Sequence, residues 1–415
     1  MSTFETKKIE EKVILLGVDV GDDTNESMKE LAELVDTAGA VVLECIIQSR
    51  EKIHPGTYLG KGKIEEVKDR ITELEATGVV CDDELTPAQL RNLEDLLNTK
   101  VMDRTMVILD IFAKRAVTSE GKIQVELAQL KFSAARLVGL RSSLSRLGGG
   151  IGTRGPGEKK LEMDRRLIND RISQLKSELK KVESHRELIR KSRDENFAFN
   201  VAIVGYTNAG KSTLLNKLTD ANILAEDKLF ATLDPTTRKL KLDSGQEILV
   251  TDTVGFIRKL PHHLIEAFKS TLEEAKYANL LIHMVDASNE EASSQMLVVY
   301  DTLRSLDVVD KDIITVFNKT DLTDKDKEFP RDFHADKILR MSAKTGEGIE
   351  DLKKTIENIL QNQRVYLEHV FSYKEAGKIA FIRKYGEIKS EEYIDEGISI
   401  KAYIPVEIFG KVMEQ

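Results

Sequence analysis

The sequence predicts an α/β protein of several domains, one of which begins with a phosphate-binding loop. Its 415 residues exceed what one hydrophobic core normally holds, which suggests about two to four domains. Short apolar runs alternate with helical patterns in two regions, and a basic helical stretch separates them. We therefore expect an N-terminal α/β domain, a helical-hairpin arm, a P-loop domain and a small C-terminal α+β domain, at residues 1–118, 119–196, 197–363 and 364–415.

Composition argues against a membrane or secreted protein. No run of about 18 uncharged apolar residues occurs, and the charged start MSTFETKKIEEK lacks the apolar stretch of a signal peptide. Cys45 and Cys81 lie in apolar strand-like runs without metal-binding or redox spacing, so we expect both to be buried structural residues. The sequence therefore predicts a cytoplasmic protein that spans no membrane.

The first hundred residues alternate between strand and helix patterns. Apolar runs at 13–20, 40–47 and 79–84 are separated by helical patterns at 26–35 and 64–77. This alternation predicts a small parallel sheet. The region contains no glycine-rich phosphate fingerprint.

Residues 119–196 are basic and helical. They hold 18 Lys or Arg and 11 Asp or Glu, a local balance of +7 on a chain of net charge −9. One apolar seam runs from Ile123 to Leu144 and a second from Leu161 to Ile189, with spacings of three, four and seven. Two such seams joined by a short loop predict an antiparallel helical hairpin.

The loop GGGIGTRGPGEKK between the two seams has more glycines than a reversal of direction needs. Arg146, Arg154, Lys159 and Lys160 lie in or beside it. Glycines let backbone N–H groups approach a phosphate, and these cations neutralise it, so we expect the arm tip to bind RNA. The alternative is a plain connecting loop with scattered charge.

The strongest motif is the P-loop from Gly205 to Ser212. It follows the apolar strand FNVAIV and precedes the helical pattern STLLNKL, which is the context that such a loop requires. Its backbone N–H groups and the following helix N-terminus bind phosphates. Lys211 should contact the β and γ oxygens, and Ser212 should coordinate Mg²⁺.

Two further segments complete the predicted phosphate site. Asp252-Thr-Val-Gly255 ends a second strand, so Asp252 can hold Mg²⁺ through water and the Gly255 amide can bind the γ-phosphate. Between the motifs, FATLDPTTR supplies threonines, of which we favour Thr232 as a metal ligand over Thr236 and Thr237. Lys211, Thr232 and Gly255 are the expected catalytic residues.

Guanine is the predicted base. The segment Asn318-Lys-Thr-Asp321 ends another strand, and a carboxylate at Asp321 can accept hydrogen bonds from N1 and N2 of guanine, a donor pair that adenine lacks. Ser342-Ala-Lys344 can offer backbone donors to the guanine carbonyl. Four motifs in this order predict a GTP or GDP site.

Hydrolysis by this site should be slow without help. Phe256 follows Gly255 where many GTPases have a glutamine that orients water, and a phenyl ring cannot do so. Outside help would come from the binding partner or from K⁺, for which Asn208 is a possible ligand.

Several segments resemble the HflX family of translation-factor-class GTPases, which is related to Obg and Era. They include YLGKGK, DDELTPAQLRNLE, DRTMVILDIFAKRA, the loop GGGIGTRGPGEKKLEMDRR, FATLDPTTR and DTVGFIRKLP. The resemblance implies a monomer that is partly ribosome-associated, binds the large ribosomal subunit and its RNA through the arm, and splits or rescues stalled ribosomes under stress. It implies a site for GTP or GDP with Mg²⁺ on Ser212 and Thr232, made of Gly205, Tyr206, Thr207, Asn208, Ala209, Gly210, Lys211, Ser212, Phe230, Ala231, Thr232, Leu233, Asp234, Asp252, Thr253, Val254, Gly255, Asn318, Lys319, Thr320, Asp321, Ser342, Ala343 and Lys344.

Two other functions are compatible with the residues. One is an RNA-binding ribosome assembly factor that uses GTP only as a structural ligand. The other is a metabolic or transport nucleotidase, for which the sequence offers neither paired catalytic carboxylates nor a metal-type His/Cys cluster.

Overall fold

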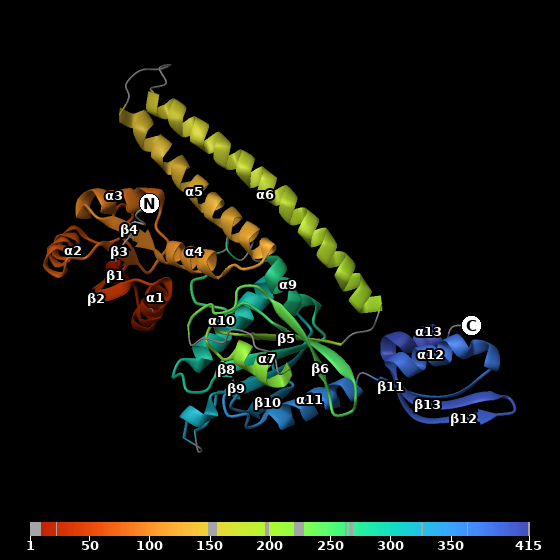
Figure 1. The fold of residues 1–415 in the computed structure, drawn as a ribbon. Helices are drawn as coiled ribbons and strands as arrows, with labels where there is room; N and C mark the ends of the chain where they lie inside the picture. Colours follow the sequence, from red (N-terminus) through yellow and green to blue (C-terminus); the bar gives the residue numbers. More distant parts are fainter. Residues whose placement is uncertain are drawn as a thin grey trace, which may run out of the picture.

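The chain forms three sheets and a long helical pair. The computed structural model describes residues 10–21, 23–147, 156–195, 199–219, 228–261, 264, 269–324, 327–362 and 364–413. The N-terminal and C-terminal sheets lie on opposite sides of a central sheet, and the helical pair rises from the centre (Figure 1). The predicted fold class is confirmed.

The N-terminal sheet is wholly parallel, in the order β2-β1-β3-β4. Its strands and helices are β1 Lys12–Asp19, α1 Thr24–Ala38, β2 Val41–Ser49, α2 Lys61–Leu74, β3 Gly78–Cys81, α3 Pro87–Leu97, β4 Lys100–Asp103 and α4 Arg104–Arg115. Helix α3 begins with a capping box between Thr86 and Gln89, and the Asp103 side chain caps α4. The parallel sheet was predicted, whereas α3, β4 and α4 were not.

The two cysteines differ in environment. Cys81 on β3 is buried, but Cys45 on β2 is exposed, so the predicted burial of Cys45 was wrong. Strand β2 is at the edge of the sheet, and Cys45 lies next to the buried Ile46, which takes the core-facing side. An apolar run therefore did not distinguish an edge strand from a central one.

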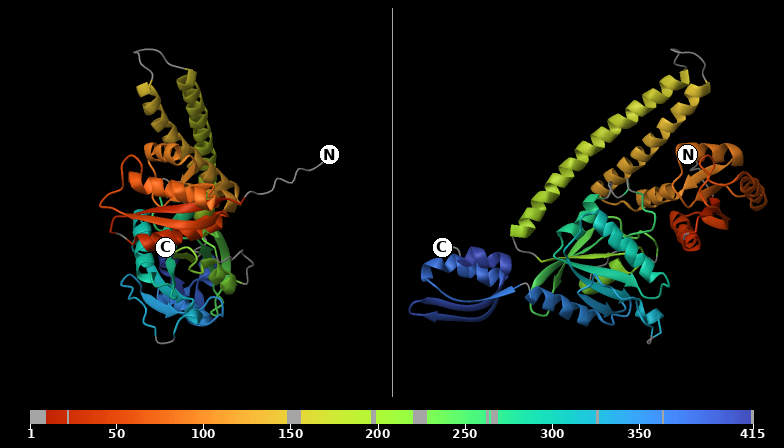
Figure 2. Two further views of the ribbon diagram at one scale, coloured as in Figure 1. Left: turned by 90° about the vertical axis from the view of Figure 1, so that its left-hand side faces the viewer. Right: turned by 180° about the vertical axis from the view of Figure 1, so that it is seen from behind.

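The arm consists of α5 (Ser119–Leu147) and α6 (Pro156–Glu195), which pack side by side and project away from the sheets (Figure 2). Arg171 on α6 makes a paired hydrogen bond to the Glu126 carboxylate on α5, at 2.7 and 2.9 Å. Leu127 and Leu175 are buried in the seam. The predicted hairpin is confirmed.

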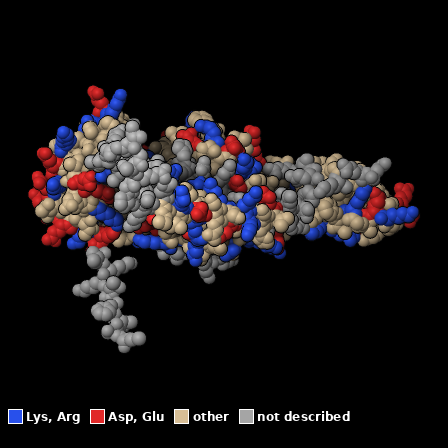
Figure 3. Space-filling model, turned by 90° about the horizontal axis from the view of Figure 1, so that it is seen from above, with Lys and Arg blue, Asp and Glu red and all other residues tan. Residues whose placement is uncertain are grey.

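The tip of the arm carries the residues predicted to contact RNA. Arg154 lies outside the described residues, as do the side chains of Arg146, Lys159 and Lys160. Seen from above, acidic and basic side chains are mixed over the described part of the surface (Figure 3). None of the described helices has both the length and the apolar character needed to cross a membrane.

The central sheet has six strands in the order β10-β9-β8-β5-β7-β6, and only β6 is antiparallel to its neighbour. Its elements are β5 Asn200–Gly205, α7 Lys211–Thr219, β6 Thr236–Lys241, β7 Glu247–Asp252, α9 Lys269–Tyr277, β8 Leu280–Asp286, α10 Ala292–Ser305, β9 Asp312–Asn318, η1 Thr320–Leu322, β10 Lys337–Arg340 and α11 Ile349–Asn362. The predicted motifs follow the carboxyl ends of β5, β7, β9 and β10, where ligands of such sheets bind.

The C-terminal domain is a three-stranded antiparallel sheet in the order β11-β13-β12. Its elements are β11 Arg364–Phe371, η2 Tyr373–Glu375, α12 Ala376–Tyr385, β12 Glu387–Ile394, β13 Gly397–Pro405 and α13 Val406–Met413. One face packs against α12 and α13 through apolar side chains such as Leu367, Ile382 and Ile408. The predicted α+β character is confirmed, whereas β12 and α13 were not predicted.

Candidate functional site

The loop between β5 and α7 requires glycine at two positions. Gly205 and Gly210 have φ angles of +151° and +97°. A Cβ atom on Gly205 would lie 2.3 Å from the carbonyl oxygen of Met284, and one on Gly210 would lie 2.2 Å from Nδ2 of Asn318. A side chain at either position is sterically excluded, so the loop can wrap closely around an anion.

Lys211 begins α7 and is buried within the loop. Its Nζ donates hydrogen bonds to the carbonyl oxygens of Tyr206, at 2.7 Å, and Gly205, at 3.2 Å. Burial lowers the pKa of Lys211 to about 8, and the charge of Asp252 opposes that shift. A bound phosphate would supply the negative charge that favours the ammonium form.

Ser212, Thr232 and Asp252 meet at one point. The Ser212 hydroxyl lies 2.7 Å from the Thr232 hydroxyl and donates to Oδ2 of Asp252, also at 2.7 Å. Oδ1 of Asp252 is buried and has no hydrogen-bond partner among the described residues. Burial raises the pKa of Asp252. Two hydroxyls and a buried carboxylate with a free oxygen fit a hydrated Mg²⁺ ion, which prefers oxygen ligands.

The segment after β7 crosses directly over the phosphate loop. A Cβ atom on Gly255 would lie 2.9 Å from Nζ of Lys211 and 2.8 Å from Cα of Thr207, so only glycine fits there. The backbone of Phe256 accepts from the Thr207 N–H at 2.8 Å and donates to the Gly205 carbonyl at 3.1 Å. The Phe256 side chain is an apolar ring and is buried, so it cannot form a hydrogen bond to a water molecule.

The predicted base-recognition segments are brought together. Asn318 donates to the Ala209 carbonyl and accepts from the Ala343 N–H, both at 2.8 Å, which joins the phosphate loop to the last motif. The Ser342 hydroxyl donates to Oδ1 of Asp321 at 2.6 Å. Lys319 forms an ion pair with Asp286 at 2.7 Å. Asp321 is thereby held with its carboxylate at the end of β9.

Most of the predicted phosphate-binding residues line one polar cavity. The predicted residues that line it are Thr207, Asn208, Gly210, Lys211, Ser212, Phe230, Ala231, Thr232, Thr253 and Gly255. Thr213 and Lys228 also line it and were not predicted. Thr213 directly follows Ser212, the last residue of the P-loop motif, and only this adjacency in the sequence could have indicated its place in the cavity. Lys228 belongs to none of the predicted motifs. Asn208 has a left-handed backbone, with φ of +61°.

Leu233, Val254, Thr320 and Lys344 were also predicted but do not line this cavity. Leu233 and Val254 are buried, and the Thr253 hydroxyl donates to the Ile203 carbonyl at 2.7 Å. Thr320 is half-buried, and Lys344 is exposed.

The loop that carries Thr232 also contacts the N-terminal domain and the arm. The Phe230 ring packs edge-to-face on Phe112 of α4, with ring centroids 4.8 Å apart. The Asp234 carboxylate binds Val117 and Thr118, just before the start of α5, and does not line the cavity. Thr236 and Thr237, the alternative metal ligands, lie in β6, where the Thr237 hydroxyl is 2.8 Å from that of Thr251. Geometry favours Thr232.

No group of three or more His, Cys, Asp or Glu side chains that could hold a metal ion occurs among the described residues.

Comparison with protein-family models gives three consecutive matches. Residues 25–113 match the N-terminal region of GTP-binding GTPases, and residues 115–193 match their middle region. Residues 200–319 match the 50S ribosome-binding GTPases.

Solved structures are similar to the chain at lower identity. A GTP-binding protein from Sulfolobus solfataricus in complex with GDP is 23% identical, and the match covers 84% of this chain and 98% of that chain with a TM-score of 0.44. The structure named as the SsGBP and GDP complex is 24% identical, with the same coverages and a TM-score of 0.47.

Curated relatives match over almost the whole chain. GTPase HflX of Lacrimispora saccharolytica is 68% identical, over 99% of this chain and 97% of the relative. The corresponding proteins of Caldanaerobacter subterraneus subsp. tengcongensis and Escherichia coli are 48% and 44% identical, over 97% and 87% of this chain and 93% and 85% of those proteins. The chain belongs to the HflX family of GTPases.

Proposed function

We propose that this GTPase binds the large ribosomal subunit and splits or rescues stalled ribosomes under stress, hydrolysing GTP to GDP and phosphate. The observation that carries the proposal is the match of residues 200–319 to 50S ribosome-binding GTPases, in a chain whose helical arm projects away from the sheets. The protein would act in the cytoplasm, partly bound to ribosomes.

Phosphoryl transfer needs positioning and charge neutralisation more than covalent help from the protein. Lys211 would turn from the P-loop carbonyls to the β and γ oxygens. Ser212 and Thr232 would coordinate Mg²⁺, with Asp252 bound to it through water, and the ion would neutralise developing charge. The Gly255 amide would bind the γ-phosphate.

Basal hydrolysis would be slow, because the buried Phe256 ring cannot orient the attacking water. K⁺ bound through Asn208 is one possible source of assistance, and Asn208 lines the phosphate cavity. The ribosomal subunit is the other, because binding could order the two loops that carry Thr232 and Gly255.

Guanine selection would rest on Asp321, which would accept hydrogen bonds from N1 and N2 of the base. The hydroxyl of Ser342 holds this carboxylate in place, and the backbone near Ala343 would donate to the guanine carbonyl. Asn318 would hold the base pocket in a fixed position relative to the phosphate loop through its two 2.8 Å hydrogen bonds.

The arm would direct its glycine-rich tip at ribosomal RNA. Arg146, Arg154, Lys159 and Lys160 would neutralise phosphates there, so binding should weaken steeply as salt rises. Replacing Arg154, Lys159 and Lys160 with Glu should weaken association with the subunit and leave GDP affinity intact. A loss of GDP affinity would instead make the arm part of the nucleotide site.

Light scattering of intact ribosomes mixed with the protein tests the proposal. We expect splitting with GTP and with a non-hydrolysable GTP analogue, and little with GDP. No splitting in any nucleotide state, together with stable binding to assembling subunits and negligible hydrolysis, would favour the assembly factor that uses GTP as a structural ligand.

A further inference from the structure

The side chain of Thr207, the third residue of the phosphate loop, is buried. The residue is 6% exposed, and its Oγ1 makes no hydrogen bond to any described residue. Its backbone N–H is satisfied, since it donates to the Phe256 carbonyl at 2.8 Å. A buried hydroxyl that is left unpaired costs stability, because it loses its hydrogen bonds to water on folding. Such a group in a native protein therefore needs an explanation.

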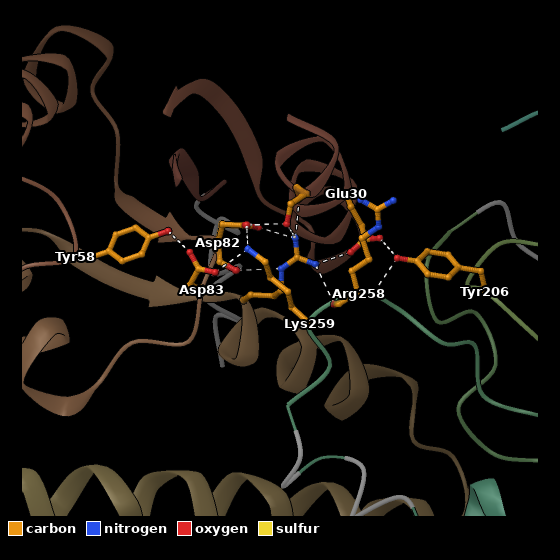
Figure 4. Close-up of polar contacts among 9 residues, drawn as sticks. Glu30, Tyr58, Asp82, Asp83, Tyr206, Arg258 and Lys259 are labelled. Atoms are coloured by element: carbon orange, nitrogen blue, oxygen red, sulfur yellow. Dashed lines mark hydrogen bonds and ion pairs between the residues drawn. The ribbon is translucent and has the colours of Figure 1, made fainter. Parts of the chain in front are cut away.

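Other polar side chains beside the phosphate loop have partners (Figure 4). The hydroxyl of Tyr206, the residue directly before Thr207, donates to the Glu30 carboxylate. The buried Asp82 carboxylate accepts from Nζ of Lys259 at 2.6 Å. Polar groups of this region are thus paired where another part of the protein is within reach.

Thr207 lies beside the groups proposed to bind the γ-phosphate. A Cβ atom added to Gly255 would lie 2.8 Å from Cγ2 of Thr207 and 2.9 Å from Nζ of Lys211, so both side chains are next to Gly255. The Thr207 hydroxyl is attached to the same carbon as that methyl group. Among the described residues that line the phosphate cavity, Oγ1 of Thr207 is the one buried side-chain nitrogen or oxygen that makes no hydrogen bond. This placement favours a bond to a ligand atom near the γ-phosphate.

GTP hydrolysis needs a group that orients the attacking water, which lies in line with the γ-phosphorus and the leaving oxygen. The Phe256 side chain cannot supply this group, but its backbone is bonded to that of Thr207. We propose that Thr207 is a catalytic residue whose hydroxyl hydrogen-bonds the attacking water. The proposal rests on the proposed roles of Lys211 and Gly255 at the γ-phosphate.

A threonine hydroxyl can accept one hydrogen bond and donate another, so it can hold a water molecule in one orientation. The water oxygen forms the new bond to the γ-phosphorus, and the bond to the β–γ bridging oxygen breaks with its electron pair leaving on GDP. The proton of the water passes to a γ-phosphate oxygen, so the hydroxyl itself does not have to take it. Thr207 contributes placement, which is what phosphoryl transfer chiefly requires.

The test compares wild type, Thr207→Val and Thr207→Ser in single-turnover hydrolysis of bound GTP by the protein alone. Val keeps the shape of the side chain and removes the hydroxyl, whereas Ser keeps the hydroxyl. We expect the rate to fall about tenfold in Thr207→Val and to stay within about threefold of wild type in Thr207→Ser. Affinity for GTP and GDP should stay within about twofold in both, because the hydroxyl contacts the water and not the phosphates.

Unfolding experiments separate a catalytic hydroxyl from a structural one. Removing a buried hydroxyl without a protein partner should leave the nucleotide-free Thr207→Val protein at least as stable as wild type. Thr105→Val is the matched control, because the Thr105 hydroxyl on α4 is also buried and makes no hydrogen bond to a described residue. This control should keep both its stability and its hydrolysis rate.

Lys211→Ala, measured in the same assay, tests the phosphate site itself. It should lose hydrolysis, and a normal rate would overturn both the proposed phosphate site and the role of Thr207. A normal rate in Thr207→Val beside an impaired Lys211→Ala would overturn the role of Thr207 alone. That role is also overturned if GTP or GDP affinity falls together with the rate, if Thr207→Ser is as slow as Thr207→Val, or if Thr207→Val loses stability.

Discussion

The Asp234 carboxylate binds Thr118 at two points: it accepts the backbone N–H at 2.9 Å and the hydroxyl at 2.5 Å. It also accepts the N–H of Val117 at 3.0 Å. The Thr118 hydroxyl in turn accepts the Gly121 N–H at 3.0 Å, so it caps the first turn of α5. Asp234 lies two residues after Thr232, which places the base of the arm in contact with the loop that approaches the metal site.

Thr118→Val should uncouple the arm from this loop. It removes the hydroxyl but keeps the backbone hydrogen bonds, so basal GTP turnover and GDP affinity should stay within about twofold. Stimulation of turnover by large ribosomal subunits should fall several-fold. Stimulated rates at saturating subunit concentrations measure this effect.

Thr86→Val is a control for the lost helix cap. Thr86 caps α3 in the N-terminal domain, where its hydroxyl accepts the Gln89 N–H at 3.2 Å. Both changes should cost about 1 kcal/mol of stability. Only Thr118→Val should reduce stimulation, and an equal reduction in the two variants would show that the effect is loss of stability alone.

Gly210→Ala should abolish nucleotide binding. The added methyl would lie 2.2 Å from the Asn318 side chain, which links the phosphate loop to the base pocket. Affinity for both GTP and GDP should fall at least about 100-fold, measured by fluorescent-nucleotide titration.

Gly245→Ala is the control that distinguishes the steric clash at Gly210 from backbone strain. Gly245 also has a positive φ, +84°, but nothing lies within 4 Å of an added Cβ. It should lose about 1 kcal/mol of stability and bind normally; weakened binding there would contradict the explanation.

The contact between Lys259 and Asp82 should depend on pH. Burial raises the pKa of Asp82, but the charges of Arg104 and Lys259 outweigh it, and the pKa is lowered overall. A carboxylate with a depressed folded-state pKa stabilises the protein above its unfolded pKa, about 3.9, and that contribution is lost as pH falls through the folded value.

Lys259→Met tests this dependence. It should cost at most about 1 kcal/mol at pH 7, since Lys259 is partly exposed. The difference in unfolding free energy from wild type should narrow below about pH 4. A difference that stays constant down to pH 2 would contradict the assignment.

The two thiols should react very differently. Cys81 is fully buried, and burial raises its pKa far above the ordinary value, whereas Cys45 is exposed and its pKa is raised less. A maleimide reagent should therefore label one thiol per native chain and two after denaturation. Labelling of Cys81 in the native protein would show that the N-terminal domain opens readily.

The sequence predicted the parts of the fold that have a local signature. Alternating runs revealed the parallel sheet around β1, and glycine spacing located Gly205 and Gly210. Strands as short as β4 are below the length at which periodicity is informative. Partners such as Thr118 and Asp234, 116 residues apart, belong to no pattern, because only the docking of domains brings them together. The same is true of Glu30 and Tyr206.

GTP turnover by the purified protein, alone and with large ribosomal subunits, tests the central claim most directly. Measurements in potassium and in sodium buffer separate stimulation by K⁺ from stimulation by the ribosomal subunit. We expect slow turnover by the protein alone and a many-fold increase with subunits. Equal rates with and without subunits in both buffers would contradict a ribosome-directed GTPase and leave a guanine-nucleotide enzyme whose partner is something else.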